Sequence, residues 1–91
     1  MFVNTEYGEF ECKDITRQER RNLYKEVKEV YASNDIEKLH NLGDKFAIIA
    51  FGDEEKADEA LKGLSAIEED VVLSTIITSY MGLALKKHTG D

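Results

Sequence analysis

Few residues of this chain have the types and spacing that chemistry requires. His40 and Asp44 stand four positions apart, the separation at which two side chains meet on one face of a helix. Two ligands are too few for a metal site, and the second histidine, His88, stands close to the C-terminus. The spacing therefore predicts a surface pair on a helix rather than a metal centre.

The other reactive residues lack the contexts in which they act. Cys12 alternates with charged residues, which favours a small core residue over a nucleophile. Neither Ser65 nor Ser74 stands in a G-x-S-x-G turn, and no G-K-[ST] follows Gly52. The acids between 54 and 59 lack the spacing of an EF-hand. We therefore expect no enzymatic activity, no cofactor and no metal.

The N-terminal residues have the two-residue period of a β-hairpin. Phe10 and Cys12 alternate with charged side chains, and Gly8 supplies the turn between two such runs. Strands are predicted near 2–6 and 9–13. Because an isolated hairpin is marginally stable in water, it must pack against the rest of the chain.

The remaining residues predict helices with clear start signals. Capping boxes begin at Thr16 and Ser65, each with a glutamate three residues later. The predicted helices are 17–32, 36–51, a short helix that starts at 53–56 and ends near Gly63, and 66–87.

Apolar side chains recur on one face of each predicted helix. In the longest helix, Ile76, Ile77 and Tyr80 are expected to be mostly buried. The stripe expected in the first helix is Leu23, Tyr24, Val27, Val30 and Tyr31. The face expected in the second is Ile36, Leu39, Gly43, Phe46, Ala47 and Ala50.

Length and composition predict a single domain. The chain has 91 residues, 42% of them hydrophobic, which suffices for one modest core. We expect one mainly α domain over 1–91, a small bundle of about four helices (16–88) with an N-terminal β-hairpin (1–14). No apolar run reaches the roughly 18 residues of a membrane span, and no secretory leader is evident, so a cytoplasmic protein is expected.

Charge is distributed unevenly along the sequence. The net charge is −7, yet six bases face three acids between Lys13 and Lys28. Between Asp53 and Asp70, eight acids face two bases. Arg17, Arg20 and Arg21 stand at the start of a predicted helix, where the helix dipole disfavours cations. They are therefore candidate partner-binding residues, although a solvated basic face would have the same sequence.

One segment looks like part of an RNA-recognition motif. Phe46–Phe51 followed by Asp53–Leu61 is similar to the third strand and second helix of that family, whose strand aromatics stack on bases. The helical period of 72–85 stands where the family has a fourth strand, and a charge of −7 repels phosphates. An RNA-binding module is thus a third alternative.

A resemblance of pattern covers residues 5–85. A short hairpin around Gly8, a Thr16–Glu19 helix start, further helices, and a last helix opened by Leu64-Ser65 and ending Tyr80-Met81-Gly82-Leu83 resemble the tail assembly chaperones of long-tailed bacteriophages. That resemblance implies a non-enzymatic protein in the host cytoplasm that holds a tape-measure protein soluble and recruits tail-tube subunits.

Two further expectations concern partners. We expect a protein partner, no nucleic acid and no membrane, and self-association is left open. A small acidic regulator that occupies the nucleic-acid site of an enzyme is the second alternative, because the acidic stretch 53–70 could imitate a row of phosphates.

Overall fold

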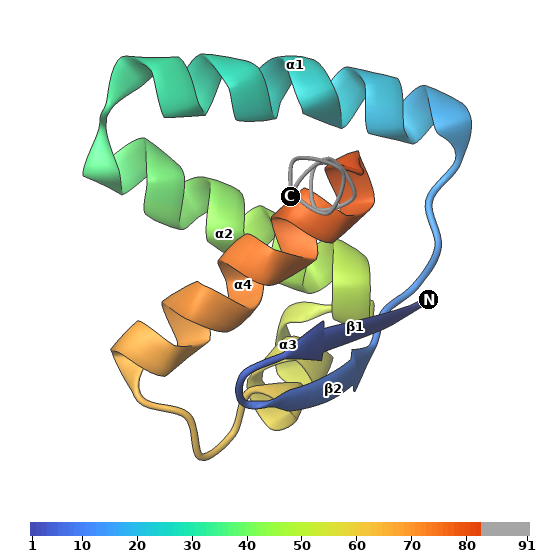
Figure 1. Ribbon diagram of the computed structural model, residues 1–91, viewed down its shortest axis with the longest axis vertical. Helices are drawn as coiled ribbons and strands as arrows, with labels where there is room; N and C mark the ends of the chain where they lie inside the picture. The colour runs from blue at the N-terminus through green and yellow to red at the C-terminus, as the bar shows by residue number, and fades with distance from the viewer. Residues whose placement is uncertain (83–91) are drawn as a thin grey trace, which may run out of the picture.

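A β-hairpin and four helices make up the computed structural model, which describes residues 1–82 (Figure 1). Strands β1 (Phe2–Thr5) and β2 (Gly8–Glu11) pair antiparallel, with Val3 opposite Phe10. Gly8 has a positive φ of 128°, a conformation in which glycine carries no steric penalty. The hairpin prediction is confirmed, with strands that end one or two residues earlier than 6 and 13.

The four helices start at the side-chain caps that the sequence indicated. They are α1 (Arg17–Ser33), α2 (Ile36–Phe51), α3 (Glu54–Ala60) and α4 (Ala66–Met81). Both capping boxes form, at the starts of α1 and α4, while Asp35 and Asp53 accept from backbone amides at the starts of α2 and α3. Hydrogen bonds from the backbone and side chain of Thr16 lower the pKa of Glu19, which fixes its charge in the first turn.

Helix α4 lies at the centre of the packing. It crosses α2 and also contacts α1 and β1, so it touches both ends of the fold (Figure 1). Ile76, Ile77 and Tyr80 are buried, as predicted, and Ile76 is 0% exposed. The ring of Phe46, also fully buried, lies 5.8 Å from that of Tyr80.

Hydrogen bonds join the hairpin and the following loop to the helices. The Tyr80 hydroxyl donates to the carbonyl of Lys13, and the Lys13 amide donates to the carbonyl of Ala50 at 2.8 Å. Cys12 is buried beside this point, and the ring of Phe10 contacts that of Phe51 edge-on at 6.2 Å. The loop after β2 is thereby held to α2 and α4 together.

The end of α4 and the exposure of two tyrosines on α1 differ from the predictions. Helix α4 ends at Met81 rather than 87, because Gly82 adopts the left-handed conformation that closes a helix. Residues 83–88 of the expected helical part lie outside the described residues. Tyr24 and Tyr31 are exposed, since α1 buries only the side of its stripe that carries Leu23 and Val27.

The start of α2 differs from its predicted face in the same way. Ile36 and Leu39 are exposed because the α1–α2 turn projects to the edge of the molecule, whereas Phe46 and Ala50 reach the core (Figure 1). The strand required for an RNA-recognition motif is not formed either, because 46–51 belongs to α2. That alternative is therefore wrong about the fold.

Candidate partner-binding site

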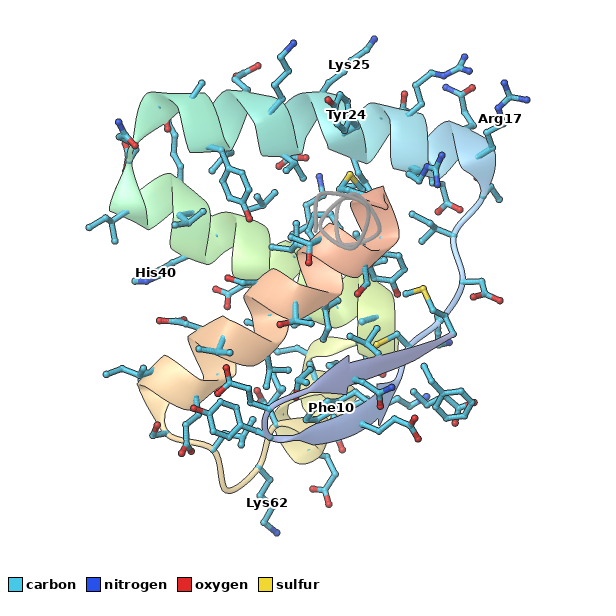
Figure 2. The ribbon with its side chains drawn as sticks, viewed as in Figure 1. Phe10, Arg17, Tyr24, Lys25, His40 and Lys62 are labelled. Carbon is cyan, nitrogen blue, oxygen red and sulfur yellow. The ribbon has the colours of Figure 1, made fainter. Side chains whose placement is uncertain are left out.

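The residues singled out for chemistry do not converge. Cys12 is buried under the hairpin, and burial raises the pKa of its thiol. His40 and Asp44 lie one turn apart on α2, and both are exposed. Figure 2 shows His40 directed away from the body of the molecule. Within residues 1–82, no group of three or more His, Cys, Asp or Glu side chains could hold a metal ion.

The three candidate arginines form an exposed patch at the start of α1. Arg17, Arg20 and Arg21, called here the arginine patch, are all exposed, and Figure 2 shows Arg17 directed into solvent. In the part of the chain that the structure describes, none of them forms an ion pair with a carboxylate. The patch is therefore available to a partner, and it has no structural task in the described fold.

The basic and acidic segments lie apart from each other. Helix α1 and helix α3 occupy opposite ends of the long axis of the molecule (Figure 1). The two ion pairs of residues 1–82 join the Met1 amine to Asp14 at 3.4 Å and Lys45 to Glu26 at 2.6 Å. The arginine patch and the acids of α3 therefore do not neutralise each other within one molecule.

A groove with an apolar floor runs between α2 and α4, and Tyr31 of α1 also lines it. Its volume is about 380 Å³. Its apolar lining is Tyr31, Leu39, Gly43, Ala66, Leu73 and Ile77. Gly43 lies directly against Leu73, where a Cβ would meet Leu73 Cδ1 at 3.5 Å, an ordinary contact distance. The two helices thus cross closely at the groove floor.

Carboxylates occupy the rim of this groove. Asp44 comes from α2, and Glu69 and Asp70 come from α4, while no lysine or arginine of residues 1–82 contributes to the lining. The pKa of Glu69 is raised by burial and then by the charges of Asp70, Asp44 and Asp58. The carboxylates therefore repel one another, and a cation bound between them would reduce this repulsion. The groove with its three carboxylates is called here the acidic groove.

The apolar floor continues onto the surface beyond the groove. A neighbouring hollow of about 220 Å³ shares Tyr31 and Leu39 with it, adds Val30 and Ile36, and is edged by the polar residues Asn34 and Asp35. Ile36 is 68% exposed and Leu39 is 40% exposed. The two hollows join into one apolar strip across the α1–α2 turn, and contiguous exposed apolar surface of this kind marks interaction sites.

Sequence reasoning missed this groove although it named many of its residues. Periodicity places Leu39 and Tyr31 on the apolar faces of their helices, and Glu69 and Asp70 stand out only as part of a long acidic segment. The one available signal was the overlap between the end of that segment and the apolar face of the last helix. His40 and Asp44, predicted as a surface pair, both lie at the groove.

Comparison with protein-family models, with curated proteins and with solved structures finds no match. Among residues 1–82, every helix is too short or too polar to cross a membrane.

Proposed function

We propose that this chain is a non-enzymatic binding protein that holds an aggregation-prone structural partner during assembly. The phage tail assembly chaperones, which its sequence pattern resembles, are the model for this function, with a tape-measure or tail-tube protein as the partner. The cytoplasm of the host cell is the corresponding compartment.

The observation that carries the proposal is the apolar strip joined to the acidic groove. A holding protein must cover apolar surface on its partner and later release it. The strip offers exposed Tyr31, Ile36 and Leu39, while the groove is small and edged with charge. Such a surface supports weak, reversible contact rather than an obligate interface, which buries much larger and more apolar areas.

The arginine patch supplies a second docking surface in this proposal. Three guanidinium groups at one helix end can pair bidentately with carboxylates of an acidic partner. Because the patch lies on α1 and the groove opens between α2 and α4, the two surfaces can contact different parts of a client.

One observation favours the acidic regulator as a second candidate function. The carboxylates of α3 at 54, 55, 58 and 59 are exposed, and no described cation pairs with them. A regulator of this kind would inhibit a nucleic-acid enzyme, and the inhibition would disappear when these four acids are neutralised.

The test is capture followed by co-expression. The chain should carry its affinity tag at the C-terminus, because the Met1 amine donates to the carbonyl of Cys12 at 3.0 Å. Partners captured from native or infected cells are identified by mass spectrometry and then expressed with and without this chain. We expect the partner to be soluble only in the presence of the chain. A captured partner whose solubility is unchanged would contradict the holding function.

The matched pair of variants for this test is Leu39→Ser and Ile67→Ser. Both remove one exposed aliphatic side chain, but Leu39 lies in the apolar strip and Ile67, 76% exposed, does not line either hollow. Loss of solubilisation in Leu39→Ser alone is the expected result. Equal effects of the two substitutions would speak against the strip.

A further inference from the structure

We propose that the acidic groove binds a basic amphipathic helix of the partner protein. In this arrangement apolar side chains on one face of the helix lie on the groove floor. Flanking lysines or arginines pair with Asp44, Glu69 and Asp70. The inference rests on the proposed function and specifies the chemistry of the segment that is held.

The shape of the groove favours a helical ligand. The groove residues of α4 extend from Ala66 to Ile77, which is about 16 Å along the axis at 1.5 Å per residue. Two turns of a bound helix, about 11 Å, fit within that length. Apolar anchors at i, i+3 or i+4, and i+7 would then contact the floor in succession.

The walls of the groove exclude an extended ligand. Both long walls are helices, whose interior backbone groups are already hydrogen-bonded within each helix, so they offer no strand edge. An extended peptide lying there would form no backbone ladder with the walls, so its amides and carbonyls would depend on water and a few side chains for partners. A helix satisfies its backbone internally and presents only side chains, which is what this groove can accept.

The charge of the rim selects a basic ligand. Three carboxylates line the groove around its apolar floor, and in the described part of the chain no lysine or arginine joins them. Cations placed between them replace mutual repulsion with attraction, and an acidic helix would add to the repulsion. Burial is the main cause of the raised pKa of Glu69, and the neighbouring charges of Asp70, Asp44 and Asp58 add to it.

A second copy of the chain is a poorer occupant than a separate partner. Each copy carries a net charge of −7, so two copies repel at long range. The basic helix of the chain is α1, whose apolar side chains Leu23 and Val27 are buried in the core and cannot lie on the groove floor of a second copy. A basic segment on another protein meets neither obstacle.

The experiment uses synthetic peptides of about 18 residues, a length at which an isolated helix is no longer negligible. The probe peptide contains leucines at helical spacing flanked by lysines, with acetylated and amidated ends. One control peptide has glutamate in place of lysine, and another has the same composition in scrambled order. Binding of fluorescent peptide to the full chain is followed by anisotropy, at low and at physiological salt. We expect the probe to bind at least about ten-fold more tightly than either control, and less tightly as salt rises.

Two triple variants separate the groove from general charge. Asp44→Asn, Glu69→Gln and Asp70→Asn together should weaken probe binding about ten-fold, because three ion pairs are lost. The matched control, Glu54→Gln, Glu55→Gln and Glu59→Gln, makes the same change in net charge on α3 and should leave binding within about two-fold. Leu39→Ser tests the floor independently and should also weaken binding, whereas Ile67→Ser should not.

Several results would overturn the inference. They are equal binding of the acidic or scrambled peptide, equal weakening by the two triple variants, and full binding by the groove variant. Concentration-dependent dimers in sedimentation velocity, abolished by the groove variant, would identify a self-association surface instead. If the groove variant still keeps the captured partner soluble, the holding function stands and the groove assignment falls. If the parent chain binds the probe but solubilises no partner, the groove assignment stands and the holding function falls.

Discussion

Two isoleucines on α4 provide a direct measurement of how the core depends on this helix. Ile76 is 0% exposed and Ile67 is 76% exposed, although both belong to the same helix and differ by nine positions. Truncating Ile76 to alanine removes three buried carbons from contact with the other helices. We expect Ile76→Ala to lower the free energy of unfolding by about 2–4 kcal/mol, the usual cost of a buried aliphatic truncation with its cavity.

The same substitution at Ile67 should have the opposite sign. Little apolar contact is lost there, and alanine has the higher helix propensity, so Ile67→Ala should be neutral or stabilising by a few tenths of a kcal/mol, about 0.4. For a domain of this size, each kcal/mol corresponds to roughly 4–8 °C in Tm. Ile76→Ala should therefore melt at least about 8 °C below Ile67→Ala.

Urea unfolding followed by circular dichroism checks both values. The two variants and the parent should share one m value, so that the difference in midpoint reports stability alone. If Ile76→Ala leaves the midpoint unchanged, the face of α4 that carries Ile76 does not form the core. If Ile67→Ala lowers the free energy of unfolding as much as Ile76→Ala does, the conclusion that Ile76 is buried and Ile67 exposed would also be refuted.

Four further predictions concern single features of the structure. Tyr80→Phe removes the hydrogen bond to the Lys13 carbonyl and should cost about 1 kcal/mol in urea unfolding. Burial raises the pKa of Tyr80. The contribution of its hydroxyl to the free energy of unfolding should therefore be complete below about pH 10, the usual tyrosine pKa, and should decline as the pH rises further. The pKa of Glu69 is also raised, so ionisation of its carboxyl opposes folding. Glu69→Gln should therefore have a higher Tm than the parent at neutral pH. The difference should disappear below pH 4.5, the usual pKa of glutamate, because the carboxyl of the parent is then protonated in both the folded and the unfolded state. Replacing the three residues of the arginine patch with glutamine should leave Tm within a few degrees of the parent and reduce capture of an acidic client. If the folded variant captures its client as well as the parent does, the patch has no role in binding. Gly43→Ala should stabilise the fold by about 1 kcal/mol, because alanine has the higher helix propensity and the added methyl meets Leu73 at an ordinary contact distance. A loss of stability would show that the α2–α4 crossing needs glycine.

Local signals explain why the element boundaries were largely predictable. Helix α2 runs over the predicted 36–51 because Asp35 caps its start and Gly52, with a φ of 111°, follows its last residue. The end of α4 was misjudged because the apolar period continues past Gly82, and the period outweighed a single glycine in the prediction. Fold class followed from these periods and was confirmed.

The candidate site could not be predicted in the same way. Leu39 belongs to the same periodic face as Phe46, and only the angle at which α4 crosses α2 decides that one is exposed and the other buried. Likewise, Asp44 belongs to α2 and Glu69 to α4, and their proximity depends on tertiary packing. Periodicity reports which side of a helix is apolar, but not how far along that side its neighbour reaches.

The central position of α4 has a consequence for folding during synthesis. Six of the core residues belong to this last described helix, so the earlier elements cannot enclose a core until it leaves the ribosome. At about 5–20 residues per second, the interval between the end of α2 and the end of α4 is roughly 2–6 seconds. Throughout that interval α1 and α2 expose their apolar sides in the nascent chain. Ribosome-bound chains halted before residue 66 should therefore be cleaved readily by protease, and chains tethered through an added C-terminal linker that places α4 outside the ribosome should become resistant in a single step.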